Sequence, residues 1–421
     1  MMTATKPFCA IVLILLLLAP LPLGAQKPDR SKPPLLGPPP ALKVAPLQRF
    51  SLSNGLPVVF MEKHEVPLVQ INVIVLAGSA MDPAQKLGLG SLTAAMLDEG
   101  AGTMDALQLA DAIDVLGADI NTSASYHSTG IMLHTPLSKL DAALPLLADI
   151  VQRPTFPRKE LDRLRKERLT THLQWRDEPR AIASVLFDRV VFGPDHPYGR
   201  PAIGTAQTLL SITVDDLKEF HESYFHAGNA RLVVVGDITL ETLRPKLEGA
   251  FGSWKKGTPA QQPAAAARQV GATSVYVVDK PGAPQSEIRI GRIGAARSTE
   301  EYFPLVVTNT ILGGSFSSRL NQNLREQHGY TYGAGSNFSF RPMPGPFLAA
   351  SAVQTAVTDK ALTEFMKELT GIRAPVPEEE LQRARNYIAL GYPDNFSSVM
   401  QIAGQLTELV LYNLPDTYFN S

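Results

Sequence analysis

Arg325 and Tyr332 are two side chains whose types and spacing suit work on a peptide bond. A guanidinium fork and a phenol hydroxyl can both donate hydrogen bonds to a peptide carbonyl, or to the oxyanion that forms when water attacks it. The pattern predicts that Arg325 ends a helix and that Tyr332 begins a strand after Gly329, so both can point into one cleft. The alternative is structural, with Arg325 paired to a neighbouring acid and Tyr332 packed in the sheet.

The elements that must position this pair belong to one of two similar bodies. The strand-like alternation at Leu68–Val73 returns at Ser286–Ile290, and a helix follows each. Farther on, each body has an apolar helical face and then a proline that leads into a long helix. The faces are Leu140, Leu144 and Leu147 in the first body and Leu362, Met366 and Leu369 in the second; the proline-led strings are Phe156–Leu161 and Val376–Leu381. An internal repeat of mixed strands and helices is therefore expected.

Low-complexity segments divide the chain. A proline-rich linker at 26–47 precedes a first domain at 48–254, and a second linker at 255–273 precedes a second domain at 274–421. The first domain closes with a helix and the valine-rich strand Arg231–Asp237, which have no counterpart before Ser421. The second domain therefore reads as truncated or unusually short.

The N-terminus has the pattern of an export signal. Lys6 precedes an apolar run from Phe8 to Ala19, and small residues end at Ala25, so residues 1–25 are predicted to be a cleaved signal peptide. A retained anchor is the alternative, although the run is shorter than the roughly 20 residues that a membrane-spanning helix needs. The one cysteine, Cys9, lies inside this segment. We expect a periplasmic or secreted protein without disulfides.

The charge balance excludes one class of partner. The formal net charge is −1 and no run of lysine and arginine is sustained, so nucleic acid is not an expected partner. Contact with a membrane is expected only through an uncleaved signal segment.

Several strings, in this order, resemble the pitrilysin/insulinase family, which includes the mitochondrial processing peptidases. They are Ser53–Leu56, Gly88–Gly90, His196–Gly199, Leu312–Leu320 and Leu324–Glu326. The likeness extends from about Phe50 to Ser421. It implies an α+β fold with two tandem homologous domains, each a mostly antiparallel sheet packed with helices.

Active members of that family carry H-x-x-E-H on the helix after Gly-Leu, where two histidines bind zinc and the glutamate takes a proton from the zinc-bound water. A glutamate on a later helix is the third ligand. Here Ser91, Ala94 and Ala95 replace the two histidines and the base, and Thr170–Thr171 replaces the later glutamate, with His172 adjacent. The resemblance therefore implies a zinc-less member that binds no cofactor itself. An unconventional site is the alternative, and its nearest candidates are Asp98, Glu99, His127 and His134.

Zinc-less members often pair with a zinc-bearing sister chain and lend it an arginine and a tyrosine, spaced R-x-x-x-x-x-x-Y, that hold the substrate backbone. The spacing assigns Arg325 and Tyr332 to this role and disfavours Tyr330. The resemblance thus implies a non-catalytic, substrate-binding subunit of a heterodimeric zinc metallopeptidase. The subunit would act on unfolded peptides only together with an H-x-x-E-H partner.

Two other interpretations stay open. The chain can be a catalytically inactive structural or peptide-binding homologue with no peptidase role. It can also be a self-sufficient peptidase, which requires stoichiometric zinc in the isolated chain.

Overall fold

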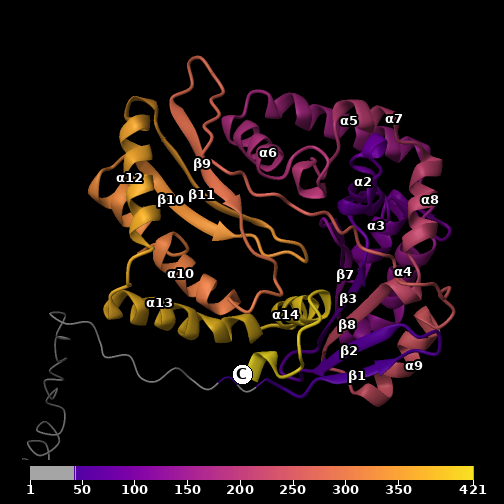
Figure 1. Ribbon diagram of the computed structural model, residues 1–421. Coiled ribbons are helices and arrows are strands. Elements are labelled where there is room, and N and C mark those ends of the chain that lie inside the picture. Colours follow the sequence, from indigo (N-terminus) through magenta and orange to yellow (C-terminus); the bar gives the residue numbers. More distant parts are fainter. Residues whose placement is uncertain (1–41, 43, 421) are drawn as a thin grey trace, which may run out of the picture. The chain divides into compact units, whose positions relative to one another are not determined.

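The computed structural model describes residue 42 and residues 44–420 of the 421-residue chain. The predicted signal peptide and most of the proline-rich linker lie outside these residues. Strands and helices alternate through two repeats, the first containing a six-stranded sheet and the second a three-stranded sheet (Figure 1). The predicted α+β fold with two tandem domains is confirmed. Within the described part of the chain, no helix is long and apolar enough to cross a membrane.

The first sheet has the strand order β1-β2-β8-β3-β7-β6. The strands are β1 (Gln48–Ser51), β2 (Pro57–Glu62), β3 (Leu68–Val75), β6 (Asp119–Ala124), β7 (Thr129–Pro136) and β8 (Ala230–Gly236). All neighbouring pairs are antiparallel except β2 and β8, which run parallel. The valine-rich β8 lies between β2 and β3 and is buried on both faces, which explains why it lacks polar alternation. A short hairpin, β4 (Gly100–Ala101) and β5 (Met104–Asp105), stands apart.

The first repeat contains several helices. They are α2 (Leu89–Ala95), α3 (Ala106–Val115), α4 (Leu140–Gln152), α5 (Arg158–Trp175), α6 (Pro179–Phe192), α7 (Ala206–Ser211), α8 (Val214–Tyr224) and α9 (Leu240–Phe251). The helices other than α6 cover one face of this sheet. The predicted apolar face of α4 is buried, and Leu140, Leu144 and Leu147 all join the main core. Polar N-caps fix where α3 and α8 begin, with Asp105 and Thr213 each in a capping box.

The second repeat follows the same order with fewer elements. Its sheet is β10-β11-β9, which corresponds to β6-β7-β3 of the first, and all its pairs are antiparallel. The elements are β9 (Gln285–Ile293), α10 (Tyr302–Leu312), α11 (Arg319–Asn321), a π-helical segment η6 (Gln322–Gln327), β10 (Thr331–Phe338), β11 (Pro346–Gln354), α12 (Thr358–Gly371), α13 (Glu378–Gly391) and α14 (Val399–Leu411). Within the described residues, this sheet has no equivalents of β1, β2 and β8.

Each repeat lends a helix to the sheet of the other. Helix α14 packs on the second face of the first sheet, where Ile402 and Leu406 share a core cluster with Val233 and other strand residues. Helix α6 contacts β9, and a Cβ atom added to Gly291 would come within 2.7 Å of the ring of Phe187. Helices α6 and α14 are equivalent in the two repeats. Each therefore packs on the sheet of the other repeat instead of its own.

The apolar face predicted for the second repeat is wrong for Leu362 and Met366, whereas Leu369 packs against the core as expected. Leu362 and Met366 of α12 are 38% and 49% exposed, and the buried side of the helix is formed by Ala361 and Phe365. In the first repeat the flank of α4 is covered by α9. No helix in the described residues takes that place beside α12, so its larger side chains remain in solvent.

Candidate functional site

The structure brings Arg325 and Tyr332 together. The guanidinium carbon of Arg325 lies 5.7 Å from the centre of the Tyr332 ring and 4.7 Å from the centre of the Phe316 ring. Tyr332 is 91% exposed, so it is not a packing residue of the sheet. Arg325 Nε also lies 3.3 Å from Glu326 Oε1, as the structural alternative expected for the arginine alone. The pair therefore presents a guanidinium and a phenol hydroxyl at one open surface.

The backbone around the pair is held firmly, although the side chains are open. Leu320 and Leu324, which precede Arg325 in the sequence, are fully buried in the core of the second repeat. Gly329 has a φ of +64°, a left-handed conformation that suits glycine, and its N–H donates to the Arg325 carbonyl at 3.0 Å. The Tyr330 N–H then donates to the Leu324 carbonyl at 2.9 Å. This turn fixes the start of β10 close to the end of η6.

Tyr330, the alternative tyrosine, faces the other way. It is half-buried, packs against the core of the second repeat and stacks on His328 with ring centres 4.9 Å apart. Its ring is therefore held by packing, whereas that of Tyr332 is exposed and contacts Arg325.

Phe316 was not predicted as a site residue. It is 64% exposed, and its backbone carbonyl accepts a 2.7 Å hydrogen bond from Asn321 Nδ2. The preceding Gly313 approaches the sheet so closely that a Cβ atom would meet Ser336 N at 2.3 Å. An aromatic side chain after two glycines was the available signal, but its contact with Arg325 depends on how the loop turns back.

Ser91, which the resemblance aligns with the first zinc-binding histidine, contacts an arginine. From α5, Arg168 donates to the hydroxyl of Ser91 at 2.9 Å through Nη1 and to its carbonyl at 2.8 Å through Nη2. The Ser91 hydroxyl in turn donates to the Ala202 carbonyl at 2.7 Å. Ala94, at the position of the catalytic base, is buried and apolar. The space next to Ser91 thus already contains a cationic group.

Burial shifts the pKa values of Arg168 and of the nearby Asp82. Asp82 accepts hydrogen bonds of 2.7 Å from the N–H groups of Gly88 and Gly90, and burial raises its pKa to about 7. Burial lowers the pKa of Arg168 to about 10, and the Asp82 carboxyl partly opposes that shift. Arg168 is thus a cation at neutral pH and has no lone pair for a metal. The donor set at this position does not fit zinc.

The later helix supplies no replacement ligand set. The Thr171 hydroxyl donates back to the Glu167 carbonyl at 3.1 Å, and His172 packs edge-on against Trp175. Burial lowers the pKa of His172, and the positive charge of Arg168 acts in the same direction.

The other candidate ligands are dispersed. His127 Nε2 lies 2.6 Å from the Tyr198 hydroxyl, His134 Nδ1 lies 3.1 Å from Gln70 Oε1, and Glu99 pairs with Arg163. Asp98 is half-buried, and burial raises its pKa to about 6. Within residues 44–420, no three His, Cys, Asp or Glu side chains are grouped so that they could hold a metal ion.

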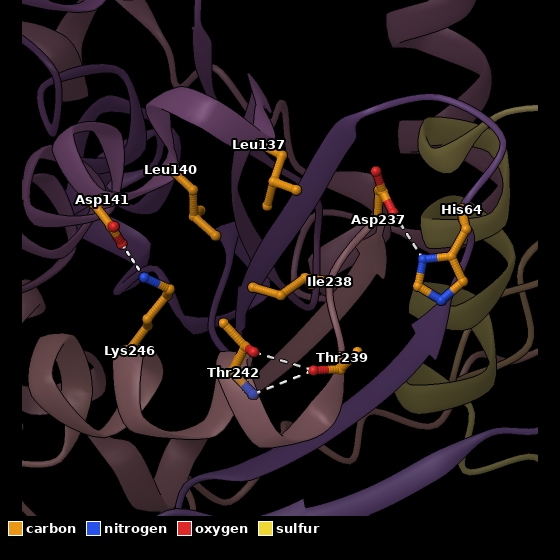
Figure 2. Close-up of a pocket in the computed structure, with 9 residues that line it drawn as sticks. All are labelled: His64, Leu137, Leu140, Asp141, Asp237, Ile238, Thr239, Thr242 and Lys246. Atoms are coloured by element: carbon orange, nitrogen blue, oxygen red, sulfur yellow. Dashed lines mark hydrogen bonds and ion pairs between the residues drawn. The ribbon is translucent and has the colours of Figure 1, made fainter.

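A cavity of about 480 Å³ lies elsewhere, in the first repeat (Figure 2). It is lined by His64, Leu137, Leu140, Asp141, Asp237, Ile238, Thr239, Thr242 and Lys246. Its charged groups pair with one another: His64 Nδ1 lies 2.7 Å from Asp237 Oδ1, and Lys246 pairs with Asp141. Hydrogen bonds to Asp237 and then Glu62 raise the pKa of His64. None of these residues was predicted as a site, and none belongs to the Arg325–Tyr332 surface.

Comparison with known proteins matches both repeats to models of peptidase family M16. Residues 58–189 match the family described as Insulinase (Peptidase family M16), and residues 211–388 match the family described as Peptidase M16 inactive domain. The chain is 28% identical over 338 residues to an uncharacterized zinc protease of Rickettsia felis, which covers 80% of this chain and 81% of that protein. It is 24% identical to a non-peptidase homolog, YmxG, of Helicobacter pylori, over 86% and 88% of the two chains. The crystal structure of a peptidase M16 inactive domain from Pseudomonas fluorescens matches with a TM-score of 0.84 and 28% identity, covering 89% of this chain and 90% of that one.

The fold and the site together define a tandem α+β chain of the peptidase type from which the zinc-binding and base residues are gone. The chain belongs to the insulinase family, peptidase family M16, as a homologue of the inactive, zinc-less type.

Proposed function

We propose that this chain is the non-catalytic, substrate-binding subunit of a heterodimeric zinc metallopeptidase of the insulinase family. The observation that carries the proposal is the meeting of Arg325 and Tyr332 at an open surface, in a chain whose own zinc position is filled by Arg168. An arginine that only stabilised the fold would not require an exposed tyrosine beside it.

In this role the pair acts on the substrate backbone. The guanidinium of Arg325 and the hydroxyl of Tyr332 donate to a peptide carbonyl, and more strongly to the oxyanion that forms as water attacks. The zinc ion and the general base belong to a sister subunit with an intact H-x-x-E-H motif, so this chain needs no cofactor of its own. Phe316 restricts the orientations of Arg325 through a cation–π contact.

The substrates that fit this role are unfolded peptides, because main-chain carbonyls are accessible only in extended, unpaired backbone. The predicted signal segment, outside the described residues, favours the periplasm or the cell exterior as the place of action. The proposal expects no peptidase activity from the chain alone.

Reconstitution tests the proposal. The purified chain is mixed with an H-x-x-E-H homologue from the same source, and cleavage of an unstructured fluorogenic peptide is measured with each chain alone and with both. Activity that needs both chains supports the subunit role. If the two chains neither associate nor gain activity together, the chain is instead the structural or peptide-binding homologue.

A further inference from the structure

A segment without regular secondary structure, residues 255–269, leads from α9 toward the second repeat and lies against the first. We call this segment the strap. The Ala260 N–H donates to Asn229 Oδ1 at 2.9 Å, and Gln262 Nε2 donates to the Leu76 carbonyl at 2.7 Å. The strap is therefore fixed to the first repeat through single side-chain hydrogen bonds and not by strand pairing.

Three buried histidines of the first repeat lie against the strap. They are 5–8% exposed: His127, His196 and His226. Gly257 covers His226 so closely that a Cβ atom added to the glycine would come within 2.3 Å of the ring nitrogen Nδ1. His127 Nδ1 lies 3.1 Å from Gln262 Oε1. In the part of the chain that the structure describes, these rings are not grouped with side chains that could hold a metal ion with them.

The hydrogen bonds of two of these rings require the neutral imidazole. His196 Nδ1 accepts from the Tyr198 N–H at 3.0 Å, so this nitrogen carries no proton. Because Gln262 Nε2 donates to Leu76, Gln262 Oε1 is the acceptor for the N–H of His127 Nδ1. His127 Nε2 then accepts from the Tyr198 hydroxyl at 2.6 Å. A second proton on either ring removes an acceptor that Tyr198 uses.

The charged groups that act on the three rings are cations. Burial is the largest cause of the lowered pKa of each histidine, and the neighbouring positive charges act in the same direction. These cations are Arg200, Lys255 and Arg341. A proton taken up by any of the rings therefore meets repulsion from the groups that already surround it.

The second repeat reaches the same place through the loop at 339–345, between β10 and β11. The guanidinium carbon of Arg341 lies 4.5 Å from the centre of the Tyr126 ring and 4.4 Å from that of Tyr198. The Ala265 N–H of the strap donates to Met343 Sδ of this loop at 3.4 Å. The strap, the loop and the histidines thus meet at one junction between the repeats.

We propose that the strap is an acid-sensitive clasp between the two repeats. At neutral pH the uncharged rings of His127, His196 and His226 hold the strap and the loop at 339–345 against the first repeat. In mildly acidic solution these histidines take up protons, cations arise beside Arg341 and Lys255, and the strap and the loop leave the first repeat. The exchanged helices α6 and α14 continue to join the repeats. This inference does not depend on the roles proposed for Arg325 and Tyr332.

The direction of the pH dependence separates the histidines from the carboxylate at this junction. Because the pKa of each histidine is lowered from 6.5, the held state binds fewer protons than the released state below pH 6.5 and becomes less stable as the pH falls. Asp188 of α6, which faces Arg341 and Tyr126, acts in the opposite direction, since burial raises its pKa from 3.8 to about 6. Release in acid therefore points to the histidines.

Hydrogen exchange of the full chain at pH 7.5 and pH 5.0 tests the proposal, with rates corrected for the intrinsic effect of pH. Protection of the strap and of the loop at 339–345 should fall at least about tenfold at pH 5.0, because more than one proton is coupled to release. Strand β3 and helix α14 should keep their protection. Unchanged protection of the strap, or an equal loss along the whole chain, overturns the proposal.

Substitution of the three histidines tests the sensor. His127→Gln, His196→Asn and His226→Gln introduce polar amides that take up no proton, so the triple variant should keep the strap protected at pH 5.0. Strap release that persists in the folded triple variant overturns the proposal. If the triple variant does not fold at pH 7.5, each single variant should shift the midpoint of release to lower pH, and an unchanged midpoint in all three overturns it.

Two further variants serve as controls. His134→Gln alters a histidine of β7 whose ring bonds Gln70 within the sheet, and acid release should be unchanged. Asp188→Asn should also release the strap at pH 5.0. Loss of release in Asp188→Asn would make Asp188 the sensor and would overturn the proposal.

Discussion

Arg168 and Ser91 form a two-point contact, in which Nη1 donates to the serine hydroxyl at 2.9 Å and Nη2 to the serine carbonyl at 2.8 Å. This contact joins α5 to α2 at the place where active relatives bind zinc. Because the arginine is a charged donor, this contact contributes to the stability of the fold.

Replacing Arg168 by methionine should destabilise the fold. The substitution leaves the half-buried carbonyl of Ser91 without that donor, and hydrogen bonds from charged donors contribute about 1.5–3 kcal/mol each. We expect a loss of about 2–3 kcal/mol in the free energy of unfolding, measured by urea denaturation. Arg158→Met, on the same helix but exposed, is the matched control and should change stability by no more than about 0.5 kcal/mol.

The raised pKa of Asp82 predicts a specific pH dependence. Because burial raises the folded-state pKa from 3.8 to about 7, the folded state binds more protons than the unfolded state between these values. The contribution of Asp82 to stability is therefore present below pH 3.8 and is lost as the pH rises to about 7. Asp82→Asn should flatten the dependence of the unfolding free energy on pH across this window, measured at pH 4.5 and 7.5. An unchanged slope would show that Asp82 titrates normally.

The exchange of helices between repeats predicts which face of α14 matters. Leu406 is fully buried against the first sheet, so Leu406→Ala should cost about 2–5 kcal/mol. Met400, on the same helix, is 57% exposed, and Met400→Ala should cost less than about 0.5 kcal/mol. Equal losses from the two substitutions would contradict the packing of α14 on the first sheet.

Phe316 should affect peptide turnover through Arg325. A cation–π contact at an exposed site is worth about 0.5–1 kcal/mol, which corresponds to a two- to fivefold change. Phe316→Leu keeps the apolar bulk but removes the ring, so activity with the sister subunit should fall by about two- to fivefold. In an Arg325→Ala background the same substitution should have no further effect, and additive losses in that double mutant would assign Phe316 a separate role.

Local sequence patterns predicted several features of this molecule correctly. The string from Leu324 to Gly333 placed Arg325 and Tyr332 correctly at a helix end and a strand start, because local turn chemistry at Gly329 decides both. The residues Ser91, Ala94 and Ala95, which stand where the family has its motif, could also be identified from one short stretch of sequence. The internal repeat predicted the order of elements that the two sheets share.

Contacts between distant segments were not predictable in this way. The guanidinium of Arg168 reaches Ser91 only because α5 packs beside α2, and spacing within either helix contains no sign of it. The exposed Leu362 and Met366 were predicted as a buried face because helical periodicity identifies an apolar stripe but not its partner. Helix α14 covers the sheet of the other repeat, and no local pattern in Val399–Leu411 identifies that partner.

The central claim is that Arg325 and Tyr332 act on substrate in the zinc site of a partner. The most direct test is the kcat of the reconstituted pair with Arg325→Ala or Tyr332→Phe, with Arg268→Ala and Tyr387→Phe as exposed controls. We predict that each site substitution lowers kcat about 10²–10³-fold while the zinc content of the partner and the association of the chains stay unchanged. Both controls should keep full activity. Undiminished kcat in both site variants would contradict the account.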